Sequence, residues 1–202
     1  MRKALVADHP DYQYEIRAID MVGPRIGSEL RNQAMLAAVA SWGLIILYLW
    51  WRYDLVFGIA AIVALLHDAM ITIAFLEFFN YEISMTVISA ILTLIGFSTN
   101  DTIVVFDRIR ENIKKSRDKS LKEVINESIN QTLSRTIITS GTVFLVVAVL
   151  YFMGGEVLRG FSFAMLIGVV VGTYSSIYIA APILIDYVER TGHQFTKTMK
   201  TK

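Results

Sequence analysis

The stretch ILTLIGFSTNDTIVVFDRIREN, residues 91–112, decides the fold of this 202-residue chain. Its first half is apolar enough to cross a bilayer, yet it holds Asn100 and Asp101 before it breaks into charge at Asp107. An ionised carboxylate at the bilayer centre costs roughly 2.5–3.5 kcal/mol on insertion scales. Helices that keep one usually turn it toward other helices or a wet cavity and use it. Asp101 is therefore the first candidate functional residue.

The composition points to a membrane protein. Hydrophobic residues make up 54% of the chain, which is more than an ordinary soluble domain carries. The absence of cysteine excludes a disulfide framework, a thiol nucleophile and a cysteine metal site. The net charge of +1 provides no field that would attract nucleic acid, so we expect no nucleic-acid partner. The start, MRKALVADHP, lacks the apolar region of a signal peptide.

Five apolar runs have the ~20-residue length that a bilayer requires. They lie at about 34–51, 55–79, 85–106, 136–153 and 161–187. The sequence therefore predicts an all-α membrane protein, a polytopic bundle of five transmembrane helices in contact with the lipid bilayer. Residues 1–33 are polar and are expected to form a short extramembrane stub, with an alternating pattern at 12–18 that favours a strand. Trp50, Trp51 and Tyr53 predict an interfacial aromatic belt.

Basic residues indicate the orientation. They gather in the loop 107–134 and in the tail 188–202, while the loop 80–84 has none. The positive-inside rule places the long loop and the C-terminal tail in the cytoplasm and the N-terminal stub outside. Within the loop, Ser120 and Glu123 have capping-box spacing and precede apolar residues at helical spacing, which predicts a cytoplasmic amphipathic helix. The basic loop either sets the topology and is otherwise a solvated face, or it forms a docking surface for a cytoplasmic or membrane partner.

Polar residues inside the spans form two candidate sites. Asp101, with Asn100 and Thr102 beside it, lies in the inner half of the third span, and Arg135 lies at the inner end of the fourth. A pair between Asp101 and Arg135 could hold two helices together, or it could carry ions. Burial disfavours the ionised carboxylate while a nearby cation favours it, so a carboxyl subject to both can change its charge. Arg135 could instead extend toward the interface.

His67 and Asp68 fall in the middle of the second span. They are either hydrogen-bonded polar contacts between helices or a second proton-handling site. A metal site would need at least one more ligand at suitable spacing, and the sequence offers none. In the fifth span, GVVVG at 168–172 predicts a close helix-packing face, and Pro182 predicts a kink near the inner end.

With these residues laid out, the chain resembles the SecF family, the membrane subunits of the SecD/SecF protein-export complex in the resistance-nodulation-division (RND) superfamily. The matching stretches are VGP at 22–24, ALLHD at 64–68, GFSTNDTIVVFDRIREN at 96–112 and NQTLSRT at 130–136. The resemblance covers the C-terminal five-span portion of the family. Members usually have a further first helix and a periplasmic domain before VGP. The chain is therefore expected to be a fragment, a truncated form or one piece of a fused SecDF chain.

The resemblance implies a function. With SecD, the family uses the proton motive force to promote protein export across the bacterial or archaeal cytoplasmic membrane. The family's proton path maps onto Asp101 and Arg135 at the interface with SecD, with Asn100 and Thr102 beside it. Implied partners are SecD, the SecYEG translocon, a YajC-like subunit and unfolded preprotein. No cofactor is implied; the coupling ion is a proton, with sodium as the alternative.

Three other functions share some of these features. A proton-coupled RND-type exporter of small molecules or lipids would share the core but needs large periplasmic domains to read its substrate. A non-transporting scaffold would use the Asp101–Arg135 pair structurally. An intramembrane protease needs converging catalytic groups, and neither GxGD nor HExxH occurs, so we expect no enzyme.

Overall fold

The computed structural model describes residues 24–53, 55–116 and 119–191. It contains α2 (Pro24–Arg52), α3 (Leu55–Phe78), α4 (Met85–Lys115), α5 (Leu121–Met153) and α6 (Gly155–Ser175), followed by a π-helical turn, η1 (Ser176–Ala180), and α7 (Ala181–Thr191). Five candidate spans among these residues are long and apolar enough to cross a membrane, which confirms the predicted helical membrane fold. The strand predicted at 12–18 and most of the C-terminal tail lie outside the described residues.

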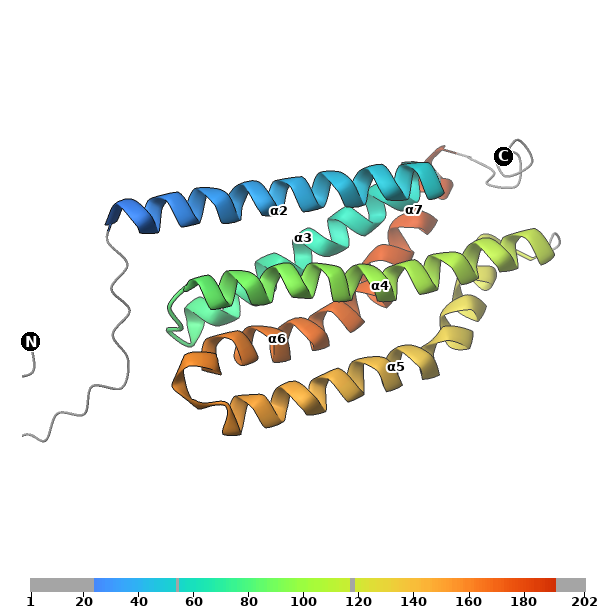
Figure 1. Cartoon of the computed structure of the whole chain (residues 1–202). Helices are drawn as coiled ribbons and strands as arrows, with labels where there is room; N and C mark the ends of the chain where they lie inside the picture. The colour runs from blue at the N-terminus through green and yellow to red at the C-terminus, as the bar shows by residue number, and fades with distance from the viewer. Residues whose placement is uncertain (1–23, 54, 117–118, 192–202) are drawn as a thin grey trace, which may run out of the picture.

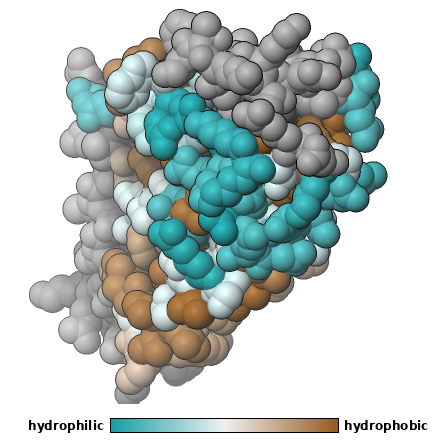
Figure 2. Space-filling view, turned by 90° about the vertical axis from the view of Figure 1, so that its right-hand side faces the viewer, coloured by the Kyte–Doolittle hydropathy of each residue, from teal (hydrophilic) through white to brown (hydrophobic). Residues whose placement is uncertain are grey.

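The helices lie side by side, with α2 along one edge of the bundle and α5 along the other (Figure 1). Between these edges, α6 packs against α3, α4 and α5. We call the end of the bundle that carries Arg52, Lys115 and Lys119 the basic end. Figure 2 looks onto this end and shows hydrophilic residues over much of it, with hydrophobic residues along the flank. A polar end on an apolar bundle is the arrangement expected where helices leave a membrane.

Several helices run beyond their apolar stretches. α4 continues to Lys115, past the apolar run that ends at 106, and α5 begins at Leu121, so the amphipathic helix and the fourth span are one helix. The Ser120–Glu123 capping box forms as predicted and fixes where α5 starts. α6 begins at Gly155, because Gly154 and Gly155 compress the expected loop into a sharp turn in which Gly155 has φ +76°.

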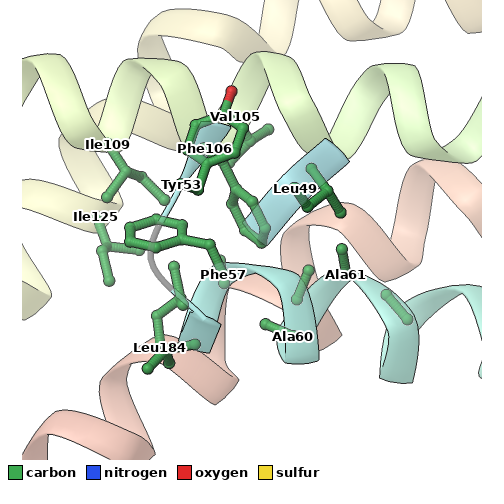
Figure 3. Close-up of a cluster of buried hydrophobic side chains, with 14 of the residues drawn as sticks. Leu49, Tyr53, Phe57, Ala60, Ala61, Val105, Phe106, Ile109, Ile125 and Leu184 are labelled. Carbon is green, nitrogen blue, oxygen red and sulfur yellow. The ribbon is translucent and has the colours of Figure 1, made fainter. Parts of the chain in front are cut away.

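A hydrophobic cluster fills the basic end of the bundle. Tyr53, Phe57 and Phe106 form its aromatic centre, with Phe57 and Phe106 edge to face at 5.1 Å (Figure 3). Tyr53 is only 3% exposed, so its predicted place in an interfacial belt is wrong, whereas Trp51 is exposed. The short α2–α3 connection explains the difference, because it folds Tyr53 back onto α4 instead of leaving it at the surface.

Pro182 follows directly after the irregular turn of the fifth span. Its ring carries no N–H, and in a regular helix it would clash with the carbonyl four residues earlier, at Tyr178. The chain meets this restriction with the π-helical turn Ser176–Ala180, which widens the helix before α7 begins. At the place where Pro182 predicted a kink, the structure has a π-helical turn.

Candidate functional site

The Asp101 carboxyl is buried between three helices. Its side chain is on α4 and is 2% exposed. The Ser140 hydroxyl on α5 donates to Asp101 Oδ2 at 3.1 Å, and the Thr173 hydroxyl on α6 donates to Ser140 Oγ at 2.7 Å. A chain of two hydrogen bonds thus joins α4, α5 and α6 at one ionisable group.

Arg135 does not contact Asp101. Its side chain is exposed, and the structure records no ion pair between Arg135 and a described residue. The guanidinium acts on the Asp101 carboxyl through space only. The sequence placed the two residues at the same end of neighbouring helices but could not give the rotation of α5. That rotation turns Thr136 and Ser140 inward and Arg135 outward.

The two neighbours of Asp101 point different ways. Thr102 is buried, while Asn100 is exposed on the outer face of α4. Successive residues of a helix are rotated by about 100° around its axis, so three consecutive residues cannot share one site. Neither the Asn100 amide nor the Thr102 hydroxyl has a recorded hydrogen bond with a described residue.

Asp68 is the second buried carboxyl and the more fully bonded one. Its side chain, on α3, is 1% exposed. Asp68 Oδ2 accepts hydrogen bonds from Ser98 on α4 at 2.5 Å and from Ser175 on α6 at 2.8 Å. His67 Nδ1 lies 3.1 Å from Asp68 Oδ1. Asp68 therefore joins α3, α4 and α6, which fits the role of a polar contact between helices.

The two carboxyls flank the contact between α4 and α6. Ser98 precedes Asp101 by three residues on α4, and Ser175 follows Thr173 by two on α6. Gly172 permits this closeness: a Cβ added there would lie 3.2 Å from Ser98 Cβ and 3.6 Å from Asp68 Oδ2. The predicted glycine packing face is thus the seam on which both polar sites are built.

Sequence reasoning missed Ser140, Thr173 and Ser175. Single hydroxyl residues are common in membrane helices and give no signal alone. Ser140 had a usable signal, because it ends a run of hydroxyl residues spaced by four along α5. Thr173 and Ser175 directly follow the glycine pair on α6, where close packing brings small polar side chains to the facing helix.

A separate ionic contact closes the basic end. Arg52 pairs with Asp107 at 3.3 Å, and Arg110 donates to the Arg52 carbonyl at 3.1 Å. Both guanidinium groups lie over the Tyr53 ring, at 5.2 and 5.8 Å. Burial, and then the neighbouring Asp107 carboxylate, raise the pKa of the Tyr53 hydroxyl above its ordinary value. This contact fixes the α2–α3 connection to α4.

Among the described residues, no three His, Asp or Glu side chains gather as metal ligands.

Comparison with known proteins identifies the family. The family model for "Protein export membrane protein SecD/SecF, C-terminal" matches residues 2–190. A protein translocase subunit SecF of Koribacter versatilis is 54% identical over 196 residues, covering 97% of this chain and 48% of the relative. One from Desulfurispirillum indicum is 49% identical over 205 residues, covering 100% of this chain and 65% of the relative. The chain thus spans about half to two thirds of these relatives.

Solved structures agree with this match. The crystal structure of SecDF, a translocon-associated membrane protein from Thermus thermophilus, superposes with a TM-score of 0.80 at 47% identity, covering 83% of this chain and 23% of that chain. A second SecDF crystal structure, in a super-membrane-facing form, gives a TM-score of 0.78 at 41% identity, covering 90% of this chain and 24% of that one. The sequence and the fold support the same conclusion: the chain belongs to the SecD/SecF family of protein export membrane proteins.

Proposed function

We propose that the chain is the membrane part of an accessory subunit of the Sec protein translocase, which with SecD uses the proton motive force to promote protein export. The relatives named as translocase subunits support the first part. The observation that carries the second is Asp101, an ionisable group that is buried within a membrane-spanning helix and bonded by the Ser140 hydroxyl instead of an ion pair. A carboxyl in that setting can gain and lose a proton without first breaking a salt bridge.

Asp101 and Arg135 are the working groups of this mechanism. With Asp101 ionised, the Arg135 charge attracts it through space, and protonation cancels that attraction. The helices can then repack, so α4 and α5 become a two-state element whose balance depends on one proton. The membrane potential supplies about 2.3 kcal/mol per charge per 100 mV, enough to bias such an element over repeated cycles. Sodium could bind the same carboxylate and remains the alternative coupling ion.

SecD is the proposed partner of the outer face of α4. A stripe of small and polar residues lies exposed on that face, at Ser89, Thr93, Gly96 and Asn100. Small residues at this spacing let a second helix approach closely, and a polar amide such as Asn100 is costly in lipid. A partner helix packed here would lie beside Asp101. SecYEG, a YajC-like subunit and unfolded preprotein follow from the family resemblance, and the basic end is taken as cytoplasmic.

The proposal is tested by export of a reporter protein in cells that lack SecF. The complete subunit carrying this chain is compared with its Asp101→Asn and Arg135→Ala variants, after co-purification shows that all three bind SecD. We expect both variants to lose most export while assembly is intact, because each removes one side of the switch. Normal export by Asp101→Asn would contradict the mechanism.

A scaffold role is the second candidate. It is favoured by the absence of an ion pair between Asp101 and Arg135, since a carboxyl satisfied by Ser140 could be purely structural. In that case Asp101→Asn, which keeps a hydrogen-bond acceptor, would support normal export, and only variants that lose SecD binding would fail.

A further inference from the structure

The side of α5 that faces the bundle carries an unusual set of residues. Between Ile125 and Val147, every buried residue of α5 bears a hydroxyl: Ser128, Thr132, Thr136 and Ser140. They recur every four residues and so lie in one row along the helix. We call this row the hydroxyl ladder.

Both ends of the ladder are bonded to polar side chains of α4. At the end that lies deeper in the membrane, the Ser140 hydroxyl donates to Asp101 Oδ2 at 3.1 Å. At the basic end, the Asn112 amide donates to Ser128 Oγ and to Gln131 Oε1, both at 2.9 Å. Gln131 is exposed. The ladder thus starts at the buried carboxyl and ends at the polar surface of the basic end.

The middle of the ladder has spare hydrogen-bonding capacity. The Thr136 hydroxyl is on a side chain only 2% exposed, yet no hydrogen bond to a described residue is recorded for it. A hydroxyl can donate one hydrogen bond and accept two, so the Thr136 hydroxyl is free to bond a water. Thr132, by contrast, donates back to the Ser128 carbonyl at 3.0 Å.

The spacing of the ladder fits bridging by water. Residues four apart on a helix are separated by about 6 Å along its axis, and the whole ladder spans about 18 Å. An O–H···O hydrogen bond is about 2.7–2.8 Å long, so one water between successive hydroxyls would connect them. The antiparallel register set by the two end contacts puts the apolar Val105 and Ile109 of α4 opposite the middle. The path would therefore be polar on the α5 side and apolar on the α4 side.

We propose that the hydroxyl ladder is the route by which Asp101 exchanges protons with the cytoplasmic side. The inference rests on the proposed function and names the residues that connect Asp101 to the cytoplasmic side in its proton path. A proton leaving the Asp101 carboxyl is taken up by the neighbouring oxygen, while each hydroxyl or water passes on its own proton. The ladder ends unchanged, Asp101 is left as a carboxylate, and one proton emerges near Gln131.

The first test is thiol labelling, because the chain has no cysteine of its own. Thr136→Cys and Val147→Cys are introduced separately into the complete subunit, with any cysteines outside this chain replaced by serine. A hydrophilic thiol reagent is then added from the cytoplasmic side of membrane vesicles. Val147 is the matched control, because it is buried on the same face of α5 beyond Ser140. We expect labelling at Thr136→Cys and none at Val147→Cys. Equal labelling at both sites, or none at Thr136→Cys, would overturn the inference.

The second test uses the reporter export of the previous section. Thr136→Val keeps the shape and removes the hydroxyl, so we expect export to fall at least about tenfold. Thr136→Ser should restore it, and Thr142→Val, at an exposed position on the same helix, should match the wild type. If Asp101→Asn fails while Thr136→Val exports normally, the ladder is wrong and the proposed function stands. If Asp101→Asn exports normally, the proposed function falls first.

Discussion

At the residue scale, the described membrane helices bury the carboxyls of Asp68 and Asp101, and hydroxyls on neighbouring helices bond to both. Asp68 accepts hydrogen bonds from the Ser98 and Ser175 hydroxyls, and Asp101 accepts one from the Ser140 hydroxyl. Burying a charged group is tolerable only when hydrogen bonds or counter-charges replace its hydration. The sequence was sufficient to find both carboxyls, because an acidic residue inside an apolar run is rare. Their partners could not be found, because a hydroxyl on another helix is identified only by how the helices rotate against one another.

Asp68→Ala should destabilise the bundle. It would leave the Ser98 and Ser175 hydroxyls buried without their acceptor, at a cost of about 1–3 kcal/mol each. Asp68→Asn keeps an acceptor oxygen and should lose less. The comparison is made by thermal unfolding in detergent, with Asp186→Ala as the control, because the Asp186–Arg190 pair is exposed. An Asp68→Ala variant as stable as the control would mean that the three-helix contact contributes nothing.

Tyr53 should make the protein sensitive to alkaline pH. Its pKa is raised, first by burial and then by Asp107, so the folded state favours the neutral phenol. The unfolded chain ionises tyrosine near about pH 10, so the stabilisation is complete below that pH and is lost as the pH rises above it. The unfolding temperature of Tyr53→Phe should therefore fall less steeply than that of the wild type as the pH rises above about 10. An unchanged pH profile would exclude Tyr53 as the cause.

At the element scale, the helices are held by glycine contacts and caps that the sequence reveals only in part. The pattern GVVVG predicted a packing face, and Gly168 and Gly172 do lie against α4. The helix lengths were predicted less well, because hydropathy marks what lipid can surround and not where backbone hydrogen bonding stops. α4 starts at the predicted residue, capped by Ser84, and its solvated C-terminal end remains helical as far as Lys115, whereas α5 starts at the Ser120 cap, well before its apolar run.

Gly168→Ala should loosen the contact between α4 and α6. The added Cβ would lie 2.5–2.9 Å from three atoms of the Leu94 side chain, so that side chain must shift within a packed seam. Overpacking of this kind typically costs about 1–3 kcal/mol. Gly141→Ala is the matched control, because an added Cβ there meets nothing within 4 Å and alanine favours a helix. Thermal unfolding in detergent compares the two; equal stability would show that the seam adjusts freely.

At the scale of the whole molecule, the described part of the chain has a basic end and, on the outer face of α4, an exposed stripe of small and polar residues. Composition and hydropathy were enough to predict five helices and a basic end, because both depend on local sequence. The outer face of α4 needed the structure, since only packing shows that Gly96 and Asn100 are left uncovered while Asp101, the next residue after Asn100, is buried. That stripe is the proposed contact surface for SecD.

Gly96→Leu should weaken SecD binding without unfolding the chain. An added Cβ at Gly96 meets nothing within 4 Å inside the bundle, so the fold can accept a larger side chain that a partner helix cannot. We expect co-purification of SecD to fall by about tenfold, equivalent to about 1.4 kcal/mol. Gly43→Leu on α2, which is equally open, is the control. Undiminished SecD recovery with Gly96→Leu would place the interface elsewhere.

The most direct test of the account is proton flow through the assembled complex. The complete subunit carrying this chain is purified with SecD, reconstituted in lipid vesicles and exposed to an imposed membrane potential while a pH-sensitive dye reports the lumen. The account predicts proton flow with the wild type and almost none with Asp101→Asn, at equal protein and SecD content. Equal proton flow with Asp101 and with Asn at position 101 would contradict it.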